Sequence, residues 1–193
     1  MSRRTIPVVL GVLVSGVFFS TLSARTWELN PYVGVFAPTE VNSFDLKNPA
    51  TFGIRGGVFL TPDLQLEGGM GYTNHFESTH TDPKSRGFLW EANGLYHFHA
   101  GRLRPFALFG VGALNAQVDK ATVPQAPDPN SVPFFRDGET FFNVSWGGGI
   151  KAQRLWGPMG IRADLRGRTI ANVRDDTVTA AEVTAGLIFD WGE

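Results

Sequence analysis

The segment that most constrains the fold is Ala181–Trp191, AEVTAGLIFDW, in which residue types alternate with a period of two. One face carries Val183, Ala185, Leu187, Phe189 and Trp191, and the other carries Glu182, Thr184, Gly186, Ile188 and Asp190. Successive side chains of a β-strand point to opposite faces, so the pattern predicts a strand with one apolar and one mostly polar face. About ten residues is also the length that a tilted strand needs to cross a bilayer.

Seven further segments of the chain repeat this design and predict strands of similar length. They are Trp27–Phe36, Thr51–Leu60, Leu64–Thr73, Gly87–Phe98, Arg104–Asn115, Phe141–Ala152 and Met159–Ile170. Arg104–Asn115 differs from the others because it is apolar on both faces, so the sequence leaves its register open. Pro31 lacks the backbone N–H that a strand ladder needs, so we expect a bulge in the first strand.

The connections between these eight segments alternate between long and short. The short ones are Thr61–Asp63, Ala100–Leu103 and Leu155–Pro158, and the long ones are Ala37–Ala50, Asn74–Arg86, Gln117–Glu139 and Ala171–Thr179. Short periplasmic turns and long outer loops are typical of membrane barrels whose termini are both periplasmic. The sequence therefore predicts an all-β fold, an eight-stranded antiparallel up-and-down transmembrane β-barrel.

Aromatic residues gather at two levels of the predicted strands. Trp27, Phe98, Trp156, Phe189 and Trp191 lie near the short turns, whereas Phe36, Phe52, Tyr72, Trp90 and Phe142 lie toward the long loops. Two aromatic belts are typical of two water–lipid interfaces. The alternative is a soluble barrel, apolar inside and polar outside. The polar face is rich in glycine, including Gly53, Gly69 and Gly149, which suits a cramped, hydrated lumen better than a surface in water.

Met1–Ala24 has the three parts of a secretory signal peptide. Arg3 and Arg4 supply the positive start, Ile6–Phe19 is apolar, and small and polar residues follow. The apolar stretch is too short for a membrane-spanning helix, and an uncleaved signal anchor is the alternative. We expect residues 1–24 to be a signal peptide and residues 25–193 to form a barrel domain exported to the bacterial outer membrane.

The composition excludes several classes of site. The chain has no cysteine, which excludes disulfides, thiolate metal sites and a cysteine nucleophile. A net charge of −1 offers no basic field for nucleic acid. His97 and His99 are only weak metal candidates, and no nucleophile setting or catalytic carboxylate pair is recognisable. We therefore expect no enzyme activity, no catalytic residues, no metal and no cofactor.

From Thr26 onward the chain resembles the small eight-stranded outer-membrane barrels, the family of the OmpA transmembrane domain, OmpX, OmpW and the opacity proteins. The motifs that carry the resemblance are Arg104–Phe106 leading to Gly110–Gly112, Gly147–Lys151, and Gly157–Arg162 followed by Asp164 and Arg166. Members of that family usually stop on an aromatic residue that the assembly machinery reads. The resemblance implies that this machinery recognises the last strand, in which Gly192 and Glu193 follow Trp191.

The predicted lumen face carries six acids and five bases. They are Glu28, Glu67, Glu91, Asp164, Glu182 and Asp190, with Arg55, Lys151, Arg162, Arg166 and Arg168. A charge inside a barrel must be paired or remain hydrated, because desolvating an isolated one is costly. We expect a lumen charge network of Arg55, Glu67, Glu91, Asp164 and Arg166 near mid-height. The network either fills the barrel or, by resemblance to the OmpA interior, forms a gate whose partners switch.

The longest loop, Gln117–Glu139, contains Phe134 and Phe135, an apolar surface-loop contact that a surface partner or lipopolysaccharide could cover. This loop favours a structural, envelope-stability or surface-interaction role. A narrow gated pore or a transporter of small or apolar compounds is the alternative, and a soluble periplasmic ligand-binding barrel is a third. The expected partners are the lipid bilayer, lipopolysaccharide, the assembly machinery and a surface partner, but no nucleic acid.

Overall fold

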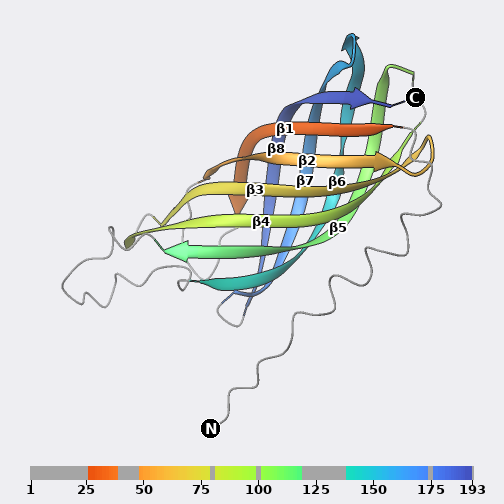
Figure 1. The fold of residues 1–193 in the computed structure, drawn as a ribbon. Coiled ribbons are helices and arrows are strands. Elements are labelled where there is room, and N and C mark those ends of the chain that lie inside the picture. Colours follow the sequence, from red (N-terminus) through yellow and green to blue (C-terminus); the bar gives the residue numbers. More distant parts are fainter. Residues whose placement is uncertain are drawn as a thin grey trace.

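The computed structural model describes residues 26–38, 48–78, 81–98, 101–118, 138–173 and 176–192. It contains β1 (Trp27–Pro38), β2 (Ala50–Phe59), β3 (Leu64–Ser78), β4 (Thr81–His97), β5 (Leu103–Val118), β6 (Glu139–Trp156), β7 (Met159–Val173) and β8 (Asp176–Trp191). Each strand pairs antiparallel with the next, and β8 pairs with β1, which closes the barrel (Figure 1). The predicted eight-stranded antiparallel barrel is confirmed.

Several predicted features lie outside the described residues. They are the signal peptide Met1–Ala24, most of the loops Ala37–Ala50 and Gln117–Glu139, including Phe134 and Phe135, and His99. Among the residues that are described, no helix is long and apolar enough to cross a membrane.

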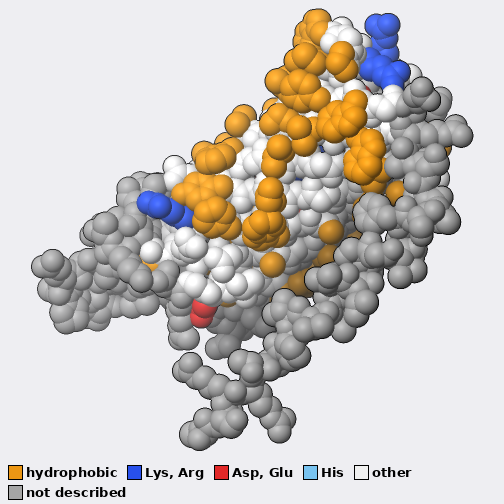
Figure 2. Space-filling view, viewed as in Figure 1, with side chains coloured by type: hydrophobic (Ala, Val, Ile, Leu, Met, Phe, Trp, Pro, Cys, Tyr) orange, Lys and Arg blue, Asp and Glu red, His pale blue; other side chains and the backbone are white. Residues whose placement is uncertain are grey.

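The barrel is apolar outside and polar inside. Val33 and Leu165 point outward and are 65% and 61% exposed, whereas Glu67 and Arg166 point inward and are 1% exposed. Figure 2 shows hydrophobic side chains spread over the outer wall. The strand period of two sends alternate residues to opposite walls, and this polarity is the reverse of that in a soluble barrel. The outer wall therefore suits lipid rather than water.

Two of the predicted long loops are largely strand. β3 continues to Ser78 and β4 begins at Thr81. Likewise, β7 continues to Val173 and β8 begins at Asp176. The prediction of long loops at Asn74–Arg86 and Ala171–Thr179 was therefore wrong. Apolar alternation ends where the lipid ends, but backbone hydrogen bonds between strands do not depend on apolar side chains, so both hairpins continue with polar residues.

The structure determines the register of β5, which the sequence left open. Phe106, Leu108 and Leu114 point into the lumen, whereas Phe109 points outward and is 63% exposed. Phe36, which we placed in the aromatic level toward the long loops, is buried and also points inward. The lumen therefore also contains apolar side chains, which the expectation of a polar interior does not predict.

Pro31 causes no bulge, which corrects the expectation for the first strand. The β1–β8 register is the same on both sides of it, with Leu29 opposite Phe189 and Tyr32 opposite Gly186. The Asn30 side-chain amide donates to the Leu187 carbonyl over 2.7 Å. A proline in β1 has no N–H to offer β8, so the amide of the preceding residue supplies the missing donor at the seam that closes the barrel.

This arrangement predicts a rescue between two substitutions. Asn30→Ala should lower the free energy of unfolding by about 1–3 kcal/mol, because it leaves the Leu187 carbonyl without a donor. Pro31→Ala restores a backbone N–H, so adding it should recover at least half of the loss. Urea unfolding of the refolded barrel in detergent measures both effects. A double variant no more stable than Asn30→Ala would contradict this account of the seam.

Candidate functional site

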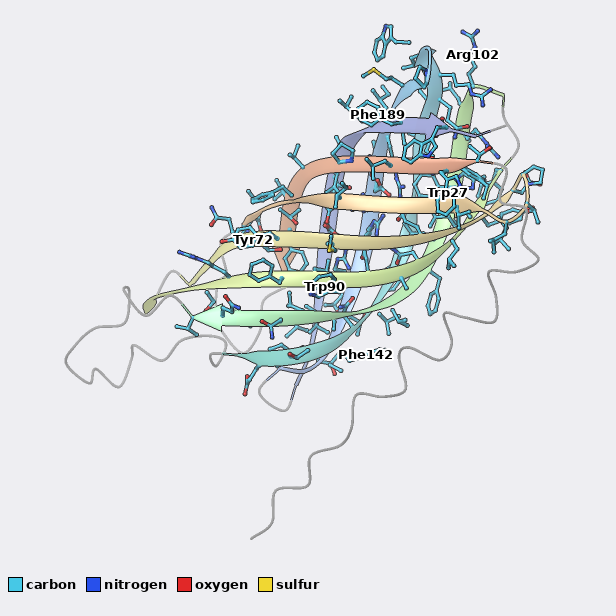
Figure 3. The ribbon with its side chains drawn as sticks, viewed as in Figure 1. Trp27, Tyr72, Trp90, Arg102, Phe142 and Phe189 are labelled. Carbon is cyan, nitrogen blue, oxygen red and sulfur yellow. The ribbon has the colours of Figure 1, made fainter. Side chains whose placement is uncertain are left out.

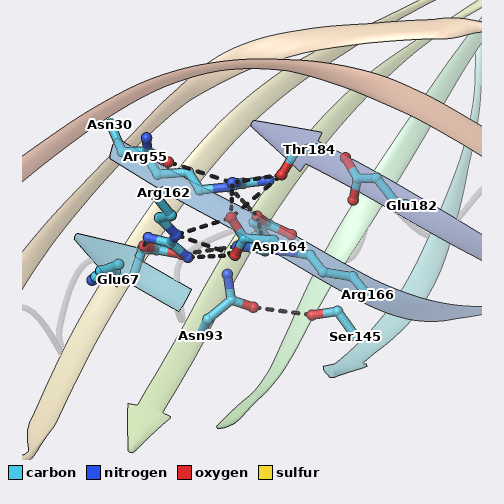
Figure 4. Close-up of polar contacts among 12 residues, drawn as sticks. Asn30, Arg55, Glu67, Asn93, Ser145, Arg162, Asp164, Arg166, Glu182 and Thr184 are labelled. Carbon is cyan, nitrogen blue, oxygen red and sulfur yellow. Dashed lines mark hydrogen bonds and ion pairs between the residues drawn. The ribbon is translucent and has the colours of Figure 1, made fainter. Parts of the chain in front are cut away.

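The lumen holds a network of charged side chains that come from seven of the eight strands. Figure 4 shows the central part of this network. Its members are Glu28, Arg55, Glu67, Glu91, Lys151, Arg162, Asp164, Arg166, Arg168 and Glu182. All ten are buried. Strand β7 supplies four of them, because residues 162, 164, 166 and 168 alternate to the same face of one strand.

Arg162 and Arg166 lie at the centre of the network. Arg162 Nη2 is 2.8 Å from Asp164 Oδ1, and its guanidinium also contacts Glu67. Arg166 donates to Glu91 Oε1 over 2.7 Å and lies 3.1 Å from Asp164 and 3.3 Å from Glu67. Glu67 and Asp164 are therefore each shared between the two arginines. This sharing neutralises both acids at the centre of the barrel.

Arg55 reaches the same group from the opposite wall. Its Nη1 atom is 3.3 Å from Asp164 Oδ2 and 3.2 Å from the Thr184 hydroxyl, and its Nε is 3.5 Å from Glu91. The guanidinium carbon also lies 3.6 Å from the centroid of the Tyr32 ring. A cation over an aromatic face is stabilised by the ring quadrupole, so Tyr32 holds Arg55 flat against the wall.

The network extends toward both ends of the barrel. On the long-loop side, Arg168 lies 2.8 Å from Glu91 and donates to Glu182 over 2.7 Å. On the short-turn side, Lys151 donates to Glu28 and to Gln65, both over 2.7 Å. These contacts cross-link the inner walls of the barrel over most of its height.

Apolar side chains gather in the lumen toward both ends of the network. The long-loop cluster consists of Phe36, Leu89, Leu114, Ala116, Phe141, Ile170, Val178 and Ala180. The short-turn cluster consists of Leu95, Phe106 and Leu108. Beside it, the His97 ring lies between Phe59 and Phe106, at 5.2 Å and 5.6 Å between ring centroids. Charged and apolar side chains therefore occupy the lumen at several levels.

The lumen glycines are covered by side chains from neighbouring strands. A Cβ atom at Gly71 would collide with the Tyr32 hydroxyl, and one at Gly149 would collide with the Phe106 ring. A Cβ at Gly69 would lie 3.0 Å from the Glu91 side chain. These glycines leave room for large side chains to lie across the narrow interior, so they do not mark an open channel.

The structure brings together Arg55, Glu67, Glu91, Asp164 and Arg166, the five residues named from the sequence. Arg162 was on the expected lumen face but outside that group, although it contacts Glu28, Glu67 and Asp164. The alternation of β7 already placed it inward, and only the register between strands put it beside Glu67. The Asn93–Ser145 hydrogen bond, 3.0 Å long, was missed, because no sequence pattern predicts which polar side chains meet across β5.

Most of the predicted aromatic belt residues lie on the outer wall (Figure 3). Trp27, Phe98, Trp156 and Trp191 are exposed toward the short turns, and Phe52, Trp90 and Phe142 are exposed toward the long loops. Tyr72 and Phe189 are half-buried. Among the described residues, no group of three or more histidine, aspartate and glutamate side chains is placed to hold a metal ion.

A family described as the outer membrane protein beta-barrel domain matches residues 10–189 of the chain. Similar solved structures include Neisserial surface protein A, 14% identical over 84% of this chain and 96% of that one, with a TM-score of 0.63. They also include OprG from Pseudomonas aeruginosa, 7% identical over 88% and 97%, with a TM-score of 0.57. Ail from Yersinia pestis is 15% identical over 86% and 99%, with a TM-score of 0.54. No curated protein matches the sequence.

The central network predicts that an acid in the lumen contributes far more to the free energy of unfolding than an acid at the rim. Glu67→Gln keeps the volume but leaves Arg162 and Arg166 under-neutralised, so it should cost about 3–5 kcal/mol of unfolding free energy. The control is Asp63→Asn, since Asp63 is partly exposed and lies 4.0 Å from Arg104. A pair exposed to water contributes about 0–1 kcal/mol. Equal urea-unfolding midpoints for the two variants would contradict a cohesive role for the network.

Proposed function

Because the chain belongs to the outer membrane protein β-barrel family and resides in the bacterial outer membrane, we propose that it is a closed membrane anchor. Its role is structural and interactive, and its long outer loops carry the contact with a surface partner or with lipopolysaccharide. The proposed role is non-enzymatic. The last strand, β8, is the segment that we propose the assembly machinery recognises.

The filling of the lumen carries this proposal. Eight strands enclose little more than their own side chains. Here the central charges contact one another, with Arg162 and Arg166 sharing Glu67 and Asp164, and apolar clusters lie in the lumen toward both ends. An ion would have to break several buried ion pairs and pass buried apolar side chains, which favours a barrel that does not conduct.

The pairing of the lumen acids supports a non-enzymatic role. General acid–base or nucleophilic catalysis needs a group with access to a substrate. Glu67, Glu91 and Asp164 are buried and held by arginines, and His97 lies between two phenylalanine rings. Each group is thus committed to a neighbouring side chain and has little access to the solvent.

The outer segments support an interactive role. Among the similar structures, one is named a surface protein and another an attachment invasion locus protein. Ail has also been solved with a heparin analogue, sucrose octasulfate. Residues 39–47 and 119–137 of this chain carry five acids against three bases, which disfavours a polyanion of that kind. Phe134 and Phe135 favour an apolar contact, such as the acyl region of lipopolysaccharide.

A closed anchor predicts a silent electrical trace. The refolded mature barrel should insert stably into a planar bilayer without discrete conductance steps, because its lumen is filled. A known channel refolded in the same detergent is the positive control. Discrete steps that change size with Arg55→Gln or Glu67→Gln would contradict the proposal and support the alternative, a narrow gated pore.

The loop proposal predicts a loss of binding without a loss of folding. Replacing Val123–Phe135 by a Gly/Ser linker of equal length should leave the unfolding midpoint unchanged. It should weaken binding of fluorescent lipopolysaccharide to the barrel in phospholipid nanodiscs by about tenfold, equivalent to about 1.4 kcal/mol. Phe134→Ala with Phe135→Ala tests the apolar contact alone. Unchanged affinity in both variants would refute the role of this loop.

A further inference from the structure

The outer wall is hollowed beside the seam that closes the barrel. A groove of about 660 Å³ crosses β6, β7, β8 and β1, and its surface is almost entirely apolar. Ala152, Ala163 and Ala185 line it with small side chains, while Leu103, Ile161 and Leu187 form larger walls. Ala163 lies directly opposite Ala185 between β7 and β8, so two small residues deepen the groove at one point.

Two arginines lie at the short-turn end of this groove. Arg102 directly precedes Leu103, and its carbonyl accepts a hydrogen bond of 2.9 Å from the Gln153 amide. Arg154 is the next residue after Gln153 in the chain. Both side chains are exposed, and Figure 3 shows Arg102 at this end of the barrel. The space-filling view shows basic side chains together here, next to hydrophobic ones (Figure 2).

The backbone of β6 is irregular where it presents Arg154. The β6–β7 register shifts between Ala152 and Trp156, and Arg154 has a φ of 53°. A bulge of this kind re-aims a side chain at the rim of a barrel. A positive φ is uncommon for a residue other than glycine, asparagine or aspartate. The nearby Arg104 differs, since it is engaged with Asp63 and Gln153.

The arginines lie at the level of the membrane surface. Trp156 and Trp191 are 63% and 50% exposed and belong to the aromatic level near the short turns. Tryptophan prefers the headgroup region of a bilayer. The groove runs from this level into the hydrocarbon, so its basic end meets headgroups while its apolar length meets acyl chains.

We propose that the groove and the arginine pair form a binding site for one anionic phospholipid of the periplasmic leaflet. The phosphate and its net negative charge lie between Arg102 and Arg154, and one acyl chain lies over Ala152, Ala163 and Ala185. A zwitterionic lipid fits the groove equally well but gains less from the arginines. The site lies on the outer wall and does not depend on whether the lumen conducts or on what the outer loops bind.

Native mass spectrometry tests the site on the refolded barrel with phosphatidylglycerol and phosphatidylcholine of the same acyl chains. Near an anionic membrane surface each basic side chain contributes about 1 kcal/mol, which is about fivefold in affinity. The wild-type barrel should retain one phosphatidylglycerol in strong preference to phosphatidylcholine. Arg102→Gln with Arg154→Gln should reduce that preference by at least about fivefold.

A second pair of variants tests the groove itself. Ala163→Leu and Ala185→Leu fill it and should reduce retention of both lipids. The matched control is Ala92→Leu, which adds the same side chain to a different apolar hollow of the outer wall, beside Trp90 and Met70. It should leave retention unchanged.

Three results would overturn the proposal. They are equal retention of both lipids by the wild-type barrel, an undiminished preference in the double arginine variant, and an equal loss in Ala92→Leu and the groove variants.

Discussion

Closure of the sheet is the constraint on which the rest of this structure depends. It leaves no open edge, and it also forces half of the side chains of eight strands into a narrow interior. Charges placed there must neutralise one another, because lone buried charges are costly. Arg162 and Arg166 do this by sharing Glu67 and Asp164. The network is therefore the core of the protein, as an apolar cluster is the core of a soluble domain.

The closing seam and this core are linked through Asn30. Its amide nitrogen replaces the donor that Pro31 lacks, and its amide oxygen accepts a hydrogen bond of 3.4 Å from Arg55. Arg55 in turn contacts Asp164 and Glu91. The side chain that completes the backbone ladder between β1 and β8 is therefore positioned by the charges in the lumen, so the stability of the seam depends on the intact network.

Because side chains occupy the interior, we expect binding sites on the outer surfaces of the barrel. Between its two aromatic levels, the outer wall faces lipid. On that wall the exposed side chains form no uniform coat, since small residues leave a groove beside the seam and β6 is irregular near the short-turn end of that groove. In our proposal, lipid is a specific ligand of this barrel as well as its solvent.

Much of this fold follows from the alternation of apolar and polar residues along the strands, with a period of two. Alternation in segments such as Ala181–Trp191 was enough to predict the strands, their number, their antiparallel order and, outside β5, most of the residues that face the lumen, because strand geometry is local. It did not predict how far β3, β4, β7 and β8 extend, since pairing beyond the lipid needs only the backbone. Nor did it reveal the register of β5, the role of Asn30, the partners of Arg162 or the groove beside Arg102. Those features depend on which residues lie opposite one another across different strands, and only the closure of the barrel brings them together.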